Sequence, residues 1–549
     1  MSRSGVVHIV ASATFLMIAG CQGRLDSLAV GEGIELSNND RDSDADDNAA
    51  PIQALDSQLR RLTEPQYINT LREAFGPSLD GVAMPSFDDD IPTIGLANDP
   101  STLRVSEVTL SSLMDDTRRV ARAVIENHSE MSACVEESDD DCFEALIRRF
   151  GTTLWRRPLS DEEFAELQSA GQALEADLSV QAELVLTGLM LSPNMLFRAE
   201  IGEDGNISQY AIASALSYSL WDSPPDAALM DLAADDRLGD PSVRAEQARR
   251  MVADPRFSEA MTRFFVDYLK LGKLKTKKKA DEVEVTPAIR TALMESAQRY
   301  LLDKLSTPGA TLFDVFQGQE FPLNALSAPY FGVGDAVGDD FEVRSVSSTE
   351  RQGILSHPAF LSVHAGEVSS GIVQRGVYTL EQLLCQHLGA PPDDISEVEE
   401  LPPGFDPAEV TSREALHVQH SSQPACAACH QFIDPAGYGY ENYDTMGRYR
   451  TVEKGDIAID ASGSLALEGE TLSFTDSVDY ITALSESEAM KSCVVKSFMT
   501  YVLGQEPGDT EMLTVKGAAE SASYRIDELA VLLVNTPSFS ERAPFSEAN

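Results

Sequence analysis

The sequence predicts a mainly α protein in which a multi-helical N-terminal region precedes a C-terminal helical module with a small β-hairpin. Two observations support this. Apolar residues recur every three or four positions, the period of an amphipathic helix, in residues 108–127, 161–193, 207–226, 288–305, 371–385, 478–503 and 524–535. In contrast, residues 457–474 alternate apolar and polar side chains and contain glycine turns, which is typical of a hairpin.

The first 21 residues have the pattern of an export signal. One arginine precedes an apolar run that is too short to span a membrane, and small residues stand directly before Cys21. This fits a bacterial lipobox, in which Cys21 is lipidated and becomes the first residue of the mature chain. An ordinary signal peptide with an incidental cysteine is the alternative. We therefore expect an exported, lipid-anchored protein of the cell envelope, in the periplasm or at the outer membrane.

The mature chain is expected to hold a disordered tether followed by folded domains. Within the predicted tether, residues 22–55, Asp and Asn dominate residues 37–51, which contain too little apolar surface to offset the entropy of ordering. A low-helix stretch at 335–348 and a Pro- and acid-rich loop at 390–407 interrupt the helical pattern. The predicted domains are an N-terminal helical domain (56–205), a central helical domain (206–340), a module with a C-x-x-C-H motif (341–454) and a C-terminal hairpin and helical domain (455–549).

The chain is strongly acidic. It has 89 acidic and 42 basic residues, a formal net charge of −47. Such a surface repels nucleic acid and anionic lipid and favours cationic partners, so we expect no nucleic-acid partner. The one basic run, residues 274–280, is interpreted as a solvated linker.

Seven cysteines bear on the compartment and on the chemistry. With Cys21 assigned to lipid and Cys426 and Cys429 to one site, four remain for disulfides in an oxidising compartment. Cys134 and Cys142 are eight residues apart and form the natural first pair. Cys385 and Cys493 are left for a long-range bridge, or else they are buried as small apolar side chains.

Cys426, Cys429 and His430 form the sequence C-x-x-C-H. This spacing suits one covalent haem c, with two thioethers from the cysteines and His430 as an axial ligand of the iron. A structural zinc site would need a second pair of ligands, which the sequence lacks. A thioredoxin-like thiol pair would follow a buried strand, whereas the residues before Cys426 do not form one. Haem c is therefore the favoured prediction.

The sixth iron ligand stays open at this point. His420 lies ten residues before His430 and is the favoured candidate, with Met446 or an open position as the alternative. His417 is a weaker third candidate. Arg448 and Arg450 are candidates to pair with the haem propionates, or else they form surface salt bridges.

Ordered motifs along the chain resemble the planctomycete-type multi-domain haem c proteins, which are built from consecutive domains of unknown function. The motifs include "LRRLTEPQYINTLREAFG", "FGTTLWRRPLSDEEF", "LSYSLWDSPPDAALMDLAADDRL", "RQGILSHPAFLSVHA" and "HSSQPACAACHQFIDPAGYGYENYDTMGRYR". The resemblance implies a cytochrome c-like C-terminal module, supports His420 as a ligand, and implies the same four disulfide cysteines. Met446 and Gln505 depart from the family pattern, so Met446 as a ligand would be peculiar to this chain.

Three functions are compatible with these patterns. The first is an electron-transfer or oxidoreductase component that works with a redox partner protein and is held at the membrane by its N-terminal lipid. The second is an enzyme for peroxidase-like or dehydrogenase-like oxidation of an extracytoplasmic substrate. The third is a surface binding protein with a structural haem domain. The sequence does not support a hydrolase, because it shows no Ser-His-Asp order typical of a catalytic triad and no Gly-rich phosphate-binding loop.

Overall fold

The computed structural model describes residues 55–87, 96, 98–100, 103, 105–172, 177–202, 205–334, 337–389, 405–406, 409–421 and 424–543. These residues belong to one compact unit, Ala50–Asn549. The predicted signal peptide with Cys21, residues 22–54 of the predicted tether and most of the 390–407 loop lie outside the described residues. Within the described part, no helix combines the length and the apolar character needed to cross a bilayer.

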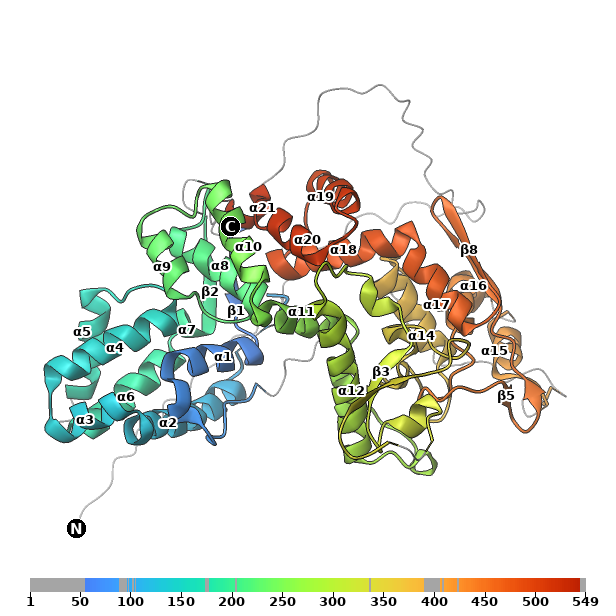
Figure 1. Cartoon of the computed structure of the whole chain (residues 1–549), viewed down its shortest axis with the longest axis horizontal. Coiled ribbons are helices and arrows are strands. Elements are labelled where there is room, and N and C mark those ends of the chain that lie inside the picture. The colour runs from blue at the N-terminus through green and yellow to red at the C-terminus, as the bar shows by residue number, and fades with distance from the viewer. Residues whose placement is uncertain are drawn as a thin grey trace, which may run out of the picture. The chain divides into compact units, whose positions relative to one another are not determined.

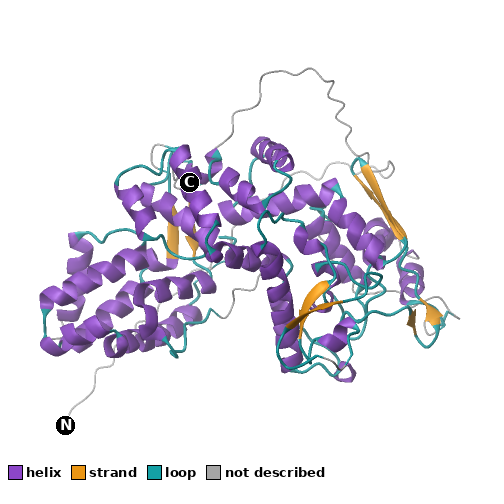
Figure 2. Ribbon diagram, in the orientation of Figure 1, coloured by secondary structure: helices purple, strands orange, loops and turns teal. Residues whose placement is uncertain are grey.

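Helices dominate the described residues, and the strands form short antiparallel pairs (Figure 1, Figure 2). The α-helices are α1 (Glu64–Phe75), α2 (Glu107–Asn127), α3 (Ser129–Glu137), α4 (Asp140–Trp155), α5 (Asp161–Gln172), α6 (Leu178–Leu191), α7 (Pro193–Leu196), α8 (Gln209–Trp221), α9 (Ala227–Ala234), α10 (Pro241–Val252), α11 (Pro255–Tyr268), α12 (Pro287–Ser306), α13 (Pro358–Val363), α14 (Ile372–Tyr378), α15 (Ser412–Ser421), α16 (Pro424–Tyr438), α17 (Ser477–Glu486), α18 (Glu488–Leu503), α19 (Asp509–Ser521), α20 (Ile526–Leu533) and α21 (Pro537–Ser540).

The remaining elements are short. The strand pairs are β1 (Gln58–Arg61) with β2 (Phe197–Glu200), β3 (Glu320–Leu323) with β4 (Glu342–Ser345), β5 (Val452–Glu453) with β6 (Ile457–Ala458), and β7 (Gly463–Leu467) with β8 (Glu470–Phe474). The 3₁₀ turns are Gly76–Leu79, Leu271–Lys275, Asp281–Val283, Asp314–Phe316, Ala328–Phe331 and Ile354–Ser356, and Thr379–Leu383 is a π-helical turn. The predicted fold class, mainly α with a small β element, is therefore confirmed.

Capping side chains explain where predicted helices begin and why two of them are divided. The stretch predicted at 161–193 forms α5 and α6, because the Asp177 side chain accepts from the backbone N–H of Val180 and starts a new helix. The stretch at 478–503 likewise forms α17 and α18, because Ser487 caps α18 through the N–H of Met490. Each of these two stretches was expected to form one helix, and this was wrong in both places. The spacing of apolar residues does not reveal a capping residue inside a helical stretch.

The predicted hairpin at 457–474 is only partly correct. Strands β7 and β8 pair in register from Gly463 with Phe474 to Leu467 with Glu470, as alternation predicts. Residues Ile457–Ala458, however, pair with the preceding strand, Val452–Glu453. The hairpin therefore begins later than predicted, because the start of the stretch has its own partner.

Two hydrophobic cores organise the described residues. The first lies among α1 to α8 and contains Phe75, Phe150 and Trp155, so it corresponds to the predicted N-terminal domain. The second runs from Ile207 to Phe539. It is shared by the segments predicted as three further domains, which therefore pack as one body around a common core.

A buried cluster of charged side chains lies where the first and last described segments of the chain meet. Glu200 on β2 accepts from Arg60 on β1 at 3.3 Å and from Arg542 at 2.5 Å, and Arg198 lies 3.2 Å away. All four side chains are at most 5% exposed. Nearby, the backbone N–H of Ala543 donates to the carbonyl of Leu55 at 2.7 Å. One carboxylate therefore holds segments that are more than 300 positions apart in the sequence together.

Two disulfides are present. Cys134 on α3 pairs with Cys142 on α4, and Cys385 pairs with Cys493 on α18, with Cα atoms 5.7 and 5.4 Å apart. This is the pairing predicted from the sequence. The first bridge is local, whereas the second ties the segment after the π-helical turn to the C-terminal helices.

Candidate functional site

The C-x-x-C-H motif lies on α16. Cys426, Cys429 and His430 are all partly exposed, and neither cysteine belongs to a disulfide. Because residues three positions apart lie on the same side of a helix, the two thiols are one turn apart on one face of α16. The preceding residues form α15, which has no buried residue, so the expectation that no buried strand precedes the motif is confirmed.

A single carboxylate joins the two candidate histidines. His420 on α15 donates from Nδ1 to Asp434 Oδ2 at 2.8 Å, and His430 donates from Nδ1 to Asp434 Oδ1 at 2.8 Å. A carboxylate accepts hydrogen bonds, so it selects the tautomer with the proton on Nδ1 in each ring. The Nε2 atom of each histidine is then the one available to a metal, the arrangement by which a carboxylate commonly orients a metal-binding histidine.

The imidazole rings of His420 and His430 lie in close contact. Their centroids are 3.5 Å apart and their planes are tilted by 39°. Nitrogen ligands on opposite sides of one metal ion are about 4 Å apart, and their ring centres are further apart still, because each metal–nitrogen bond is about 2 Å long. His420 and His430 are therefore adjacent groups in this arrangement.

A cavity of about 730 Å³ opens beside these histidines. Its volume lies in the usual range for cofactor and small-molecule sites. Apolar side chains alternate with a few polar groups around it. The lining residues are Phe405, Val410, Arg413, Glu414, His417, Val418, His420, Ser421, Ala427, His430, Gln431, Asp434, Pro435 and Tyr438.

The residues of this site fit a covalently attached haem. Two thiols one helical turn apart and the histidine that follows them are the donor set for haem c. His430 already has its Nδ1 occupied by Asp434, so Nε2 is the remaining ligand atom. The adjoining cavity is large enough for a cofactor and carries apolar walls. Cys426, Cys429 and His430 are thus the residues that would hold the group.

Three family models match consecutive parts of the chain. PSD3, a protein of unknown function (DUF1587), matches residues 60–126; PSD4, a protein of unknown function (DUF1592), matches 207–333; and PSCyt3, a protein of unknown function (DUF1588), matches 351–453. The chain belongs to the planctomycete-type multi-domain cytochrome c-like proteins. The resemblance seen in the sequence motifs is thereby confirmed. No curated protein and no solved structure matches the chain.

The PSCyt3 domain holds the C-x-x-C-H helix in place through close backbone contact. An added Cβ at Gly376 on α14 would lie 2.1 Å from the carbonyl oxygen of Ile433, and one at Gly437 on α16 would lie 2.1 Å from that of Ile372. Only glycine permits this approach. The two glycines therefore set how closely α14 and α16 pack.

Arg375 secures the loop that follows α16 in the PSCyt3 domain. Its buried guanidinium donates to the carbonyls of Tyr440 and Tyr443 at 3.0 and 2.9 Å, and to those of Leu361 and Asp444 at 3.2 and 2.8 Å. Burial lowers the pKa of Arg375 to about 10, which still leaves the group charged at neutral pH. Charge-assisted bonds to four carbonyls make this loop a rigid support for the site.

The basic run at 274–280 supports the same loop, which the sequence did not reveal. Lys279 donates from Nζ to the carbonyl of Gly366 at 2.9 Å and to the carbonyl and hydroxyl of Thr445 at 2.8 Å each. Burial, together with Lys277, lowers the pKa of Lys279 to about 7. The interpretation of this run as a solvated linker was therefore wrong for Lys279, because its ammonium group finds three oxygen acceptors inside the domain.

The two arginines predicted to pair with propionates lie elsewhere. Arg448 is exposed, stacks over Tyr330 at 4.4 Å and lies 3.6 Å from Asp444. Arg450 lies 3.6 Å from Glu441 and 3.7 Å from Glu453. Neither lines the cavity. The cationic side chain that does is Arg413.

Arg413 was not predicted. It lies over the ring of Tyr438 at 4.2 Å and donates to the carbonyls of Asp460 and Ser462. Its position depends on how α15 packs against the loop before β7, which no local sequence pattern encodes. This is why sequence reasoning chose the two arginines that follow the motif instead.

Met446 is a core residue. Its side chain is fully buried, and the hydroxyl of Ser362 lies 3.8 Å from its sulfur. It does not line the cavity beside His430. The thioether alternative for the sixth ligand therefore has no support from this arrangement.

His357 and His364, in the motif "LSHPAFLSVHAGE", are expected to be hydrogen-bonded structural residues, and both are buried. His357 caps α13, accepting from the N–H of Ala359, and lies 3.1 Å from the hydroxyl of Ser296. His364 donates from Nε2 to the carbonyl of Leu269 at 3.1 Å. Burial lowers the pKa of each to about 3, so both are neutral.

One local prediction was wrong. Asp434 and Pro435 were expected to bend the chain directly after His430, yet α16 continues through them to Tyr438. Pro435 removes only the hydrogen bond to the carbonyl of Gln431, and Gln431 is exposed, so water can satisfy that oxygen. The helix therefore tolerates the proline, and Asp434 stays one turn from His430.

Proposed function

We propose that this chain is an exported c-type haem protein that acts as an electron-transfer or oxidoreductase component. The observation that carries the proposal is a C-x-x-C-H motif on α16 whose histidine is oriented by Asp434 and lines a cavity of about 730 Å³. Such a group supplies one-electron oxidation and reduction when bound.

The protein's own residues have distinct roles in this proposal. Cys426 and Cys429 attach the group, and His430 binds the iron through Nε2. Asp434 holds the His430 ring in one orientation through its 2.8 Å hydrogen bond. Arg413, in the cavity wall, offers a guanidinium fork to a propionate. Attachment of this kind requires an exported chain, and Cys21 would hold the mature protein at the membrane within reach of a redox partner protein.

A second candidate, peroxidase-like or dehydrogenase-like oxidation, is favoured by one observation. His420 lies beside His430 on the same carboxylate, and Met446 is in the core. Neither is positioned across from His430 in this arrangement. An exchangeable position on the iron would suit binding of a small oxidant, whereas a position filled by a protein side chain would suit electron transfer.

Attachment is tested by producing the full chain in a bacterium that matures c-type haem. We expect one covalent haem per chain, seen as a Soret band and as haem staining that survives denaturing electrophoresis. Cys426→Ser with Cys429→Ser is expected to abolish covalent staining. His417→Ala, which changes another residue of the cavity wall, is the matched control and is expected to keep it.

The outcomes separate the proposals. A chain that is correctly folded and never carries haem under these conditions overturns the haem proposal. In the matured protein, low-spin iron that does not bind cyanide favours electron transfer. Loss of the low-spin spectrum in His420→Ala would identify His420 as the sixth ligand. High-spin iron that binds cyanide favours oxidation of a substrate.

A further inference from the structure

A second cavity lies at the Cys385–Cys493 disulfide. It has a volume of about 750 Å³ and shares no lining residue with the cavity beside His430. The Cys385 residue forms part of its wall, together with Tyr268, Gln382, His387, Lys496 and Glu506. The disulfide is therefore accessible from a pocket of ligand size, which a purely structural bridge does not require.

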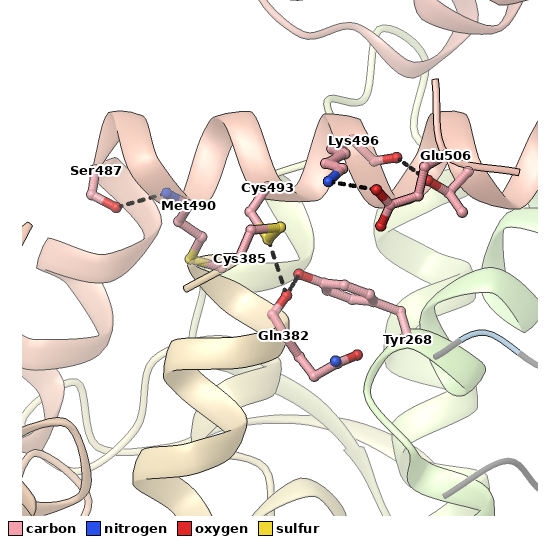
Figure 3. Close-up of a disulfide and its surroundings, with 9 residues drawn as sticks. Tyr268, Gln382, Cys385, Ser487, Met490, Cys493, Lys496 and Glu506 are labelled. Carbon is pink, nitrogen blue, oxygen red and sulfur yellow. Dashed lines mark hydrogen bonds and ion pairs between the residues drawn. A yellow bond between two sulfur atoms is a disulfide. The ribbon is translucent and has the colours of Figure 1, made fainter. Parts of the chain in front are cut away.

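The two sulfurs differ in their surroundings (Figure 3). Cys385 is exposed, whereas Cys493 on α18 is 2% exposed. An incoming thiol can reach one sulfur and not the other, the asymmetry that gives thiol–disulfide exchange a defined direction of attack. The disulfide Cys134–Cys142 also joins a buried cysteine, Cys134 at 1% exposed, to a more accessible one, but its outer residue, Cys142, is only partly exposed.

The backbone around Cys385 is unusual. Cys385 has φ of 51°, in the left-handed region that side chains other than glycine seldom adopt. It follows the π-helical turn Thr379–Leu383, a rare element that is frequent at functional sites. The carbonyl of Gln382 in this turn accepts from the hydroxyl of Tyr268 at 2.6 Å and lies 3.3 Å from Cys493 Sγ (Figure 3). The buried sulfur is thus held while the exposed one faces the pocket.

Charged groups line the pocket beside the disulfide. Lys496 lies one turn beyond Cys493 on α18 and also lines the pocket (Figure 3). Its ammonium group pairs with Glu506 at 3.0 Å. A cation near a cysteine stabilises its thiolate and makes it a better leaving group. His387 lies in the same wall.

We propose that this pocket is a thiol–disulfide exchange site whose substrate is a dithiol. A thiolate of the dithiol forms a bond to Cys385 Sγ, the Cys385–Cys493 bond breaks, and the electron pair goes to Cys493 Sγ, which takes up a proton. The second thiol of the substrate then attacks its own mixed-disulfide sulfur and releases Cys385. The dithiol loses two electrons and two protons, and the protein disulfide gains them.

Selective reduction tests the proposal in the full, folded chain. Cys426 and Cys429 are first either occupied by haem or blocked with N-ethylmaleimide, so the readout does not depend on haem. Dithiothreitol is added, samples are quenched with acid, and new thiols are alkylated and counted by peptide mass spectrometry. We expect Cys385–Cys493 to be reduced about tenfold faster than Cys134–Cys142, because its outer sulfur is exposed.

Two variants test the direction of attack. In Cys493→Ser, the Cys385 thiol is expected to react rapidly with 5,5′-dithiobis(2-nitrobenzoate). In Cys385→Ser, the Cys493 thiol is expected to react slowly. Circular dichroism checks that both variants fold, and if either does not, the rates in the unchanged protein decide. Equal rates for the two native bridges, or faster reduction of Cys134–Cys142, would overturn the proposal.

The role of charge is tested on one helix. Lys496→Gln is expected to slow reduction about threefold by removing the cation near Cys493. Lys491→Gln is the matched control, because Lys491 also lies on α18 and pairs with Glu488 at 2.8 Å. A C-x-x-C protein dithiol replaces dithiothreitol in a parallel series. Faster reduction by the protein identifies a protein substrate, and faster reduction by dithiothreitol identifies a small one.

Discussion

At the scale of single residues, the Asp434 carboxylate determines how the two candidate histidines are presented. It is 4% exposed and accepts from His420 on α15 and His430 on α16. Both bonds join α15, which has no buried residue, to α16. A residue that joins two helices and orients two rings affects both the fold and the chemistry of the site.

Asp434→Asn is therefore expected to release α15. Hydrogen bonds to a charged group contribute about 1.5–3 kcal/mol, so amide exchange in residues 412–421 should become about tenfold to a hundredfold faster. Hydrogen–deuterium exchange measures this directly. Glu468→Gln, which removes an exposed carboxylate in the β7–β8 turn, is the control and should leave these amides unchanged. Unchanged exchange in both variants would contradict the role of Asp434.

Part of this site is visible in the sequence. Cys426, Cys429 and His430 follow from spacing alone, and Asp434 could have been added, because four positions from His430 is one helical turn. The contact between His420 and Asp434 could not, since it depends on the packing of α15 against α16. Arg413 was missed for the same reason. It reaches the cavity from α15, on the other side of the motif in sequence from Arg448 and Arg450.

At the scale of elements, the pair α14 and α16 shows how closely the helix with the C-x-x-C-H motif is packed. Gly437→Ala places a Cβ about 2 Å from the carbonyl of Ile372 and is expected to destabilise the protein by about 1–3 kcal/mol, the usual effect of overpacking. Urea unfolding followed by circular dichroism measures the change.

The same experiment has an internal control. Gly517 on α19 has no heavy atom near the position of an added Cβ. Gly517→Ala should raise stability by about 0.5–1 kcal/mol, because alanine is a better helix former than glycine. If both substitutions had the same effect, the close contact between α14 and α16 would not be what makes Gly437 necessary.

Element types were predicted well where the pattern is local. The helices at 108–127 and 207–226 and the hairpin β7–β8 follow from apolar periods and glycine turns. Strands β1 and β2 were not predicted, because each is four residues long and its partner lies more than 130 positions away. Short strands that pair at long range leave no periodic signal.

At the scale of the whole molecule, Glu200 neutralises a group of buried arginines. Burial alone would raise the pKa of its carboxyl, but Arg60, Arg198 and Arg542 lower it to about 2. Because the folded pKa lies below the ordinary value of 4.5, the carboxylate stabilises the fold above that pH. This contribution is lost progressively as pH falls from about 4.5 towards 2.

Glu200→Gln is expected to destabilise the protein by about 3–5 kcal/mol at neutral pH, since it leaves buried arginines without a counter-charge. It should also flatten the fall in stability below pH 4.5. Thermal unfolding between pH 2 and pH 7 measures both effects. Glu183→Gln breaks an exposed pair with Arg122 and is the control, with an expected change below about 1 kcal/mol. Equal effects of the two substitutions would contradict the importance of burial.

The same cluster means that the described chain begins and ends at one place. Leu55 bonds to Ala543, Ser57 donates to the carbonyl of Ala543 at 2.6 Å, and Glu200 clamps Arg60 and Arg542. Chains with adjacent ends tolerate circular permutation. Joining residue 543 to residue 55 through a short linker and opening the chain at the exposed β7–β8 turn would therefore keep every contact of the cluster. Such a permutant would move the chain ends from the cluster to the β7–β8 turn.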